Sequence, residues 1–378
     1  MSMRYQAGIV LPGYNALKVA NAPTIGTATV ASGTSVSVAF TAPACVGGGA
    51  ISSYTAFACC GVKLTSGASS PLVVTGLTTG SSYTFKVIAT NAYGPSYPSA
   101  ASNSATPVAQ GQDAYITPGT YSWVAPSGVT SVSVVTVGGG GGGRTVCSGP
   151  CTPTFYNSGG GGALAYANNI TVIPGNSYAV VVGAKGNGGG SGTAGGFSSF
   201  NGTSVKAGGG GISLSASTGA AGGAGGTVLN GTGGAGGNGG TYGSTCGGGG
   251  APGGGGAGGY AGAGGLGATG VNNNGSAGSG GGGGGGASLS NYWGGGGGVG
   301  ILGQSSNGAG GTTSSYLTSG GCGGSGGTKG GSNPCYGIAA GGAYGGGGTV
   351  QQPGGVGAVR IIYPGTTRSF PSTNTGNL

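Results

Sequence analysis

The sequence contains no histidine and a single acidic residue, Asp113, and charged residues make up only 3% of its 378 positions. General acid–base catalysis, base-assisted nucleophiles and oxygen-ligated metal sites need His, Asp or Glu. A glycosidase needs two carboxylates, and this chain has one. These shortages predict a protein that is not an enzyme, has no catalytic residue, and uses no cofactor and no metal.

Clustered positive charge is also missing. The ten Lys and Arg residues give a net charge of +9 but never form a run. A nucleic-acid-binding protein usually shows a basic stripe, so no nucleic-acid partner is expected. No apolar stretch is long enough to cross a bilayer, which predicts no membrane insertion. No apolar segment follows Met1, so no signal peptide is expected.

Eight cysteines are present, but no C-x-x-C pair occurs and histidine is absent. Zinc ligation is therefore disfavoured, and disulfides or plain thiols are the better interpretation. The candidates for disulfide bonds are Cys147, Cys151, Cys322, Cys335, Cys45 and Cys59. Cys147 and Cys151 can close a small loop, whereas Cys45 can pair with Cys59 or its neighbour Cys60 but not with both. The connectivity stays open.

Glycine accounts for 107 residues, and it is concentrated in short bursts between Gly208 and Gly355. So much glycine would ordinarily indicate disorder. The hydrophobic fraction of 36% and the near absence of charge argue against disorder, because disordered chains are usually charged or poor in apolar residues. We therefore expect an ordered structure of two or three domains.

Residues 22–107 alternate apolar and polar side chains in short segments separated by turns, as in a β-sandwich. The segment 83–95, which reads YTFKVIATNAYGP, carries the most specific pattern. Together with Phe40 and the segment 51–54, it resembles a fibronectin type III domain. This resemblance implies that Tyr83 is the corner tyrosine of that family. Such domains are spacers or interaction modules, so the resemblance alone assigns no function.

Residues 108–378 are predicted to form one glycine-rich domain. Residues 108–114 are expected to be a linker, and strands are expected within 115–207 and over 357–363, with the glycine insert at about 208–356 and a tail at 364–378. The pattern of 121–137 running into glycine, followed by 163–186, resembles the glycine-rich domain of anaplastic lymphoma kinase-type receptors. The segment 357–375 resembles the end of glycine-rich proteins of marine and cyanobacterial tailed phages. A looser resemblance, in composition and layout, is to adhesins of contractile-tailed phages.

These resemblances imply polyglycine II helices, which have three residues per turn and no internal hydrogen bonds. Their N–H and C=O groups need partners in neighbouring helices, and only glycine lets the backbones approach closely enough. The expected fold class is all-β: a fibronectin type III β-sandwich, then a β-sandwich scaffold with an inserted polyglycine II helix bundle. The segments between the bursts would be loops at the two ends of the bundle.

Loops on a rigid scaffold commonly carry binding sites, and Trp and Tyr dominate interface hot spots. The candidate receptor-binding residues are Tyr292, Trp293, Asn291, Tyr316, Tyr336, Tyr242, Phe155 and Tyr156. The competing interpretation is that these aromatic residues are packed plugs that cap the bundle. Which loops share one end cannot be derived from the sequence.

The resemblances imply a virion protein made in the host cytoplasm, a tail-fibre or tip adhesin of a bacteriophage. Residues 1–21 would be an attachment arm that binds other virion proteins, and the loops would bind a bacterial surface receptor or glycan. A homo-oligomer is compatible with these features. One alternative is a structural decoration or fibre-shaft protein. Another is an ice-binding or cell-adhesion protein, which would require a regular Thr or Ala face on the outer helices.

Overall fold

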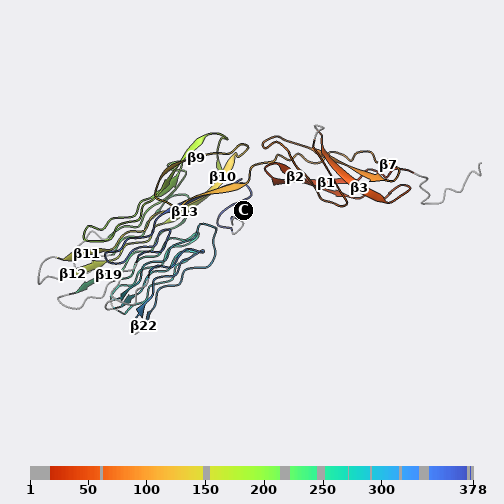
Figure 1. Ribbon diagram of the computed structural model, residues 1–378. Helices are drawn as coiled ribbons and strands as arrows, with labels where there is room; N and C mark the ends of the chain where they lie inside the picture. Colours follow the sequence, from red (N-terminus) through yellow and green to blue (C-terminus); the bar gives the residue numbers. More distant parts are fainter. Residues whose placement is uncertain are drawn as a thin grey trace, which may run out of the picture. The chain divides into compact units, whose positions relative to one another are not determined.

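The computed structural model describes residues 18–59, 63–147, 154–212, 222–244, 252–270, 272–289, 292–314, 317–331, 340–372 and 375. Two compact units are present (Figure 1). The first comprises the described residues up to Gln110 with Pro126–Gly128, and the second comprises Gly111–Ala125 and the described residues from Val129 onward. Within these residues every regular element is a β-strand and none is a helix, which confirms the all-β class.

The first unit is a β-sandwich of two sheets. The three-stranded sheet has the order β1 (Thr24–Ser32), β2 (Ser35–Thr41), β5 (Leu72–Val74). The four-stranded sheet has the order β4 (Leu64–Gly67), β3 (Ile51–Ala58), β6 (Phe85–Asn91), β7 (Gly94–Pro95). Every second residue of β6 is buried, as expected for strands with one face on a core.

Two aromatic residues show how the sequence pattern becomes packing in this unit. Phe40, on β2, is buried, and its ring centroid lies 4.8 Å from that of Tyr54 on the opposing sheet. The hydroxyl of Tyr83 accepts a hydrogen bond from the Thr78 N–H over 3.1 Å, so Tyr83 occupies the corner position predicted for it.

After β7 the chain continues beside β6 with a period of three residues. The N–H groups of Ser96, Ser99 and Ser102 donate to carbonyls of β6, and each serine Oγ accepts an N–H of β6 over 2.9 to 3.0 Å. For each of these three N–H groups of β6, a serine Oγ therefore takes the place of the backbone carbonyl that would accept it in a regular sheet. The buried N–H groups of β6 are satisfied without a regular strand beside them.

The second unit contains two five-stranded sheets. One has the order β18 (Thr232–Gly234), β13 (Leu164–Thr171), β10 (Ser131–Val137), β24 (Ala358–Tyr363), β8 (Gly111–Tyr115). The other has the order β17 (Val228–Asn230), β16 (Val205–Ala207), β15 (Ser198–Phe200), β14 (Ser177–Val182), β9 (Gly119–Val124). The last strand, β24, lies between β10 and β8, so the chain closes the scaffold after all the glycine.

The predicted linker over residues 108–114 is wrong in part, because Gly111–Tyr115 forms β8 and pairs with β24. The sequence pattern did not indicate this strand, because β8 contains polar residues. The carboxylate of Asp113 accepts a hydrogen bond from the Trp123 indole N–H over 2.8 Å, and Trp123 belongs to the other sheet. The one acidic side chain thus links the two sheets.

Glycine runs extend from the scaffold and bond to one another through their backbones. The first run covers residues 138–143. Its N–H groups donate in turn to the segments 160–163, 193–196 and 352–355. N–H groups three residues apart reach the same segment: Gly138 donates to Ala163 and Gly141 donates to Gly160, each over 2.9 Å. Carbonyls of the run accept from three further segments, at Gly186, Gly210 and Gly348. One run is therefore bonded to six neighbours.

No side chain fits between these runs. A Cβ added to Gly161 would lie 2.0 Å from the carbonyl oxygen of Gly256, and one added to Gly139 would lie 2.1 Å from that of Ala184. Real Cβ atoms do not approach so closely. The close approach of the backbones therefore requires glycine at these positions, which explains the composition of the insert.

The bundle joins the scaffold through an apolar cluster. Tyr260 is fully buried, and its ring stacks on Phe370 with centroids 5.7 Å apart. Its hydroxyl donates to the carbonyl of Gly300 over 3.2 Å and accepts the N–H of Gly303 over 3.1 Å. The turns of the glycine insert and the C-terminal tail are thereby held on the same core as β10 and β24.

A substitution at Gly283 tests whether the close approach of neighbouring backbones requires glycine. Its Cβ would lie 2.2 Å from the oxygen of Gly297, whereas a Cβ on the exposed Gly190 would meet nothing within 4 Å. We expect Gly283→Ala to destabilise the second unit by about 3 kcal/mol or more, because backbone atoms must move and buried hydrogen bonds are lost. Thermal unfolding of the variant measures this loss.

Gly190→Ala is the matched control and should melt within about 1 °C of wild type, as surface changes usually do. Equal melting temperatures for the two variants would contradict the packing described here.

Buried tyrosines predict a loss of stability in alkali. Burial raises the pKa of Tyr260 above its ordinary value of 10.0, and burial also raises the pKa of Tyr166. The unfolded chain therefore releases these protons first as the pH rises. The stabilisation is complete below about pH 10 and is lost progressively above it.

Melting temperatures measured between about pH 8 and about pH 11 should fall most steeply above pH 10. Tyr260→Phe should melt lower than wild type at pH 8, because the Gly303 N–H loses its acceptor, yet it should show a shallower alkaline slope. An unchanged slope would show that Tyr260 does not titrate on unfolding.

Candidate functional site

Short strands cover the end of the bundle that lies away from the scaffold, which we call the far end. One three-stranded sheet there consists of β11 (Arg144–Cys147), β12 (Thr154–Asn157) and β19 (Thr241–Ser244). Two hairpins follow, β20 (Ser288–Leu289) with β21 (Tyr292–Trp293) and β22 (Thr313–Ser314) with β23 (Leu317–Thr318). Figure 1 shows β11, β12, β19 and β22 at the end of the glycine runs opposite β9 and β10.

Hydrogen bonds connect these strands into one surface. The N–H of Gly270 donates to the carbonyl of Thr241 in β19 over 3.2 Å. Asn273 and Ser288 exchange two backbone hydrogen bonds, which continue the surface to β20. The strands and the described residues 269–270 and 272–274 therefore form one continuous end of the bundle, although they are distant in sequence.

The far end brings together five of the eight predicted receptor-binding residues. Tyr292 and Trp293 form β21, Phe155 and Tyr156 lie on β12, and Tyr242 lies on β19. Tyr156 and Tyr242 are direct partners in the β12–β19 pair. The remaining three, Asn291, Tyr316 and Tyr336, lie outside the described residues.

Trp293 and Tyr156 are both partly exposed. The Trp293 Nε1 is buried and has no hydrogen-bond acceptor among the residues described, and the buried Thr145 hydroxyl on β11 also has no hydrogen-bond partner among them. Buried polar atoms are usually paired, so two unpaired ones at the same end of the bundle are unusual. The far end thus combines partly exposed aromatic surface with polar groups that have no partner in the described part of the chain.

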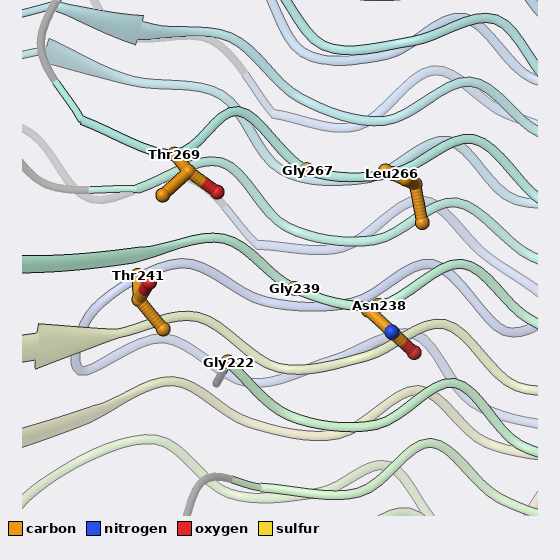
Figure 2. Close-up of a pocket in the computed structure, with 7 residues that line it drawn as sticks. All are labelled: Gly222, Asn238, Gly239, Thr241, Leu266, Gly267 and Thr269. Atoms are coloured by element: carbon orange, nitrogen blue, oxygen red, sulfur yellow. The ribbon is translucent and has the colours of Figure 1, made fainter. Parts of the chain in front are cut away.

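A pocket of about 230 Å³ lies on the side of the bundle near β19 (Figure 2). It is lined by Gly222, Asn238, Gly239, Thr241, Leu266, Gly267 and Thr269. Figure 2 shows Thr241 and Thr269 at one end and Asn238 and Leu266 at the other, with glycines between them. The sequence analysis missed this site, although its non-glycine residues recur at a spacing of three.

The cysteine candidates separate into described and undescribed side chains. Cys59 is an exposed free thiol and Cys322 is a partly buried free thiol, so Cys59 forms no disulfide with Cys45 in this structure. Cys151 and Cys335 lie outside the described residues, as does the side chain of Cys147. The other pairings stay predictions.

The charged and metal-binding inventory of the described residues is small. Over the ranges given above, His, Cys, Asp and Glu form no group of three or more that could hold a metal ion. The same ranges contain no helix that is long enough and apolar enough to span a bilayer.

Comparison with known proteins identifies the first unit only. Residues 21–105 match the family model of the fibronectin type III domain, and this segment is such a domain. No curated protein matches the chain. The sandwich of two sheets and the corner tyrosine described above agree with that family.

Three solved structures are similar to parts of the chain. Domains A168-A170 from titin share 28% identity over 24% of this chain and 33% of that one, with a TM-score of 0.22. Titin kinase with its flanking domains shares 17% identity over 44% of this chain and 30% of that one, with a TM-score of 0.21. Chitinase ChiA74 from Bacillus thuringiensis shares 18% identity over 42% of this chain and 26% of that one, with a TM-score of 0.19. The chain thus matches a third or less of each, and TM-scores this low support no functional argument.

Proposed function

We propose that the protein is a non-enzymatic virion protein of a tailed bacteriophage, a tail-fibre or tip adhesin that binds the host cell surface. The observation that carries the proposal is the convergence of aromatic strands at the far end of a bundle held together by its backbone. Tyr156, Tyr242 and Trp293 come from three separate parts of the chain and lie on one continuous surface. Aromatic side chains on a rigid support are the usual anchors of a protein–ligand contact.

In this proposal the glycine runs are polyglycine II helices, as in the glycine-rich domains that the second unit resembles. The three-residue period of the hydrogen bonds supports this identification, because that helix has three residues per turn. Six bonded neighbours around the run 138–143 also fit a packed bundle of such helices. The bundle then serves to hold the far end rigidly.

The remaining parts receive supporting roles. The fibronectin type III domain is a spacer, and residues 1–21 attach the protein to other virion proteins. The receptor is a glycan or an outer-membrane protein, bound by aromatic contacts and by neutral hydrogen-bonding groups. Chemistry on the receptor is not expected, because the only carboxylate, Asp113, is bonded to Trp123 inside the scaffold.

A second function, that of a structural decoration or fibre-shaft protein, is favoured by the extensive backbone bonding, which suits a rod. In that case the far-end strands would contact other subunits rather than cells. Binding to cells separates the two possibilities.

The test uses the labelled full-length chain and a panel of bacterial strains that includes cyanobacteria, with binding measured by flow cytometry. We expect saturable binding to a few strains. Trp293→Ala should weaken it about tenfold or more, because large aromatic residues dominate interface energetics.

Tyr97→Ala is the matched control, since Tyr97 is 83% exposed but belongs to the first unit. It should bind as wild type does, and both variants should melt near the wild-type temperature. Binding to none of the strains would contradict the adhesin and leave the structural function as the better account, and equal binding by both variants would contradict the assignment of the binding site to Trp293. Hydrolysis of surface polysaccharide would contradict both.

A further inference from the structure

In the outer layer of the bundle the exposed side chains recur at every third residue, which those of the far end do not. Along the run 232–241 the exposed residues are Thr232, Ala235 and Asn238, and the glycines between them are mostly buried. On the neighbouring run the exposed residues are Ala263, Leu266 and Thr269. Every third side chain points to solvent because the other two positions face adjacent runs, where no Cβ fits.

The pocket lies where these two runs are side by side. The N–H of Gly267 donates to the carbonyl of Asn238 over 2.9 Å, and three residues later Gly270 donates to Thr241 over 3.2 Å. The two runs are therefore parallel and in a fixed register. This register places Leu266 beside Asn238 and Thr269 beside Thr241, with Gly239 and Gly267 in the floor between the pairs (Figure 2).

The walls of the pocket carry hydrogen-bonding groups that the described structure does not use. The side-chain hydroxyls of Thr241 and Thr269 make no hydrogen bond to any described residue. Asn238 is held through its Oδ1, which accepts the N–H of Gly225 over 2.8 Å, so its amide N–H groups are not used in this bond. Opposite this polar group, Leu266 exposes 55% of its surface.

We propose that this pocket is a binding site for a neutral saccharide. Two hydroxyls and one oriented amide can donate to and accept from sugar hydroxyls, and Leu266 can pack on the C–H face of a sugar ring. The glycine floor allows the ring to approach the backbone closely. By the rise of a three-residue helix, the two pairs of walls lie roughly 9 Å apart, which suits one or two sugar rings.

The ligand is neutral rather than anionic because no lining residue is charged. Recognition of a phosphate, sulfate or carboxylate usually employs Arg or Lys. A peptide is a poorer fit, because the pocket offers a single apolar side chain, Leu266. The site adjoins the far end through Thr241 and Thr269, but none of the far-end aromatic residues lines it, and it does not require that the protein be an adhesin.

Surface plasmon resonance on the immobilised full-length chain tests the proposal. The neutral probes are cellobiose, maltose and lactose, and a heparin disaccharide is the anionic probe. We expect a saturable response to at least one neutral disaccharide and none to heparin. Thr241→Val combined with Thr269→Val should weaken the response about tenfold, because the shape is kept while two hydrogen-bonding groups are removed.

Thr227→Val is the matched control, because Thr227 is an exposed threonine on another outer run and does not line the pocket. It should bind as wild type does, and both variants should melt as wild type does, since the substituted pocket hydroxyls bond to no residue within the described ranges. Absence of a response to all neutral probes, a response to heparin alone, or equal binding by the double variant would overturn the proposal. No cells are used, so this outcome is independent of the test of the far end.

Discussion

Backbone hydrogen bonds between glycine runs are the constraint on which the second unit depends. Each run is held by N–H and C=O groups that would otherwise be buried without partners, an arrangement that costs free energy for every orphaned group. Such bonds form only where backbones touch, and a Cβ at Gly161 or Gly139 would collide with a carbonyl oxygen. The same constraint keeps ionised side chains out of the interior of the bundle, because a core made of backbone has no place for them.

This constraint leaves three places for side chains in the glycine bundle of the second unit. Large apolar residues such as Tyr260 and Phe370 gather where the bundle meets the scaffold. Small or polar residues such as Ala235 and Asn238 occupy every third position of the outer layer. Aromatic residues such as Trp293 lie at the far end, where the runs stop. Interaction surfaces of the bundle are therefore confined to the outer layer and the far end, where our two proposals place their sites.

The sequence analysis predicted the parts that rest on local pattern. Strands were expected within 115–207 and over 357–363, and β10, β14 and the closing strand β24 lie in those ranges. It missed β8, because Gln112 and Asp113 make that strand polar and only its contact with Trp123 explains the acid. It also missed the pocket, since nothing local in two x-Gly-Gly segments reveals that Asn238 and Leu266 are neighbours.

Register is the deeper reason why the neighbours could not be predicted. Glycine runs are nearly identical, so one run could slide past another by three residues and recover almost the same backbone bonds. Side-chain bonds to the backbone remove this degeneracy. The Oδ1 of Asn307 accepts the N–H of Gly281 over 2.7 Å, and Ser198 binds both the N–H of Gly183 and the carbonyl of Val137. A few such residues, rather than the glycines, select one register and so determine which side chains meet at the surface.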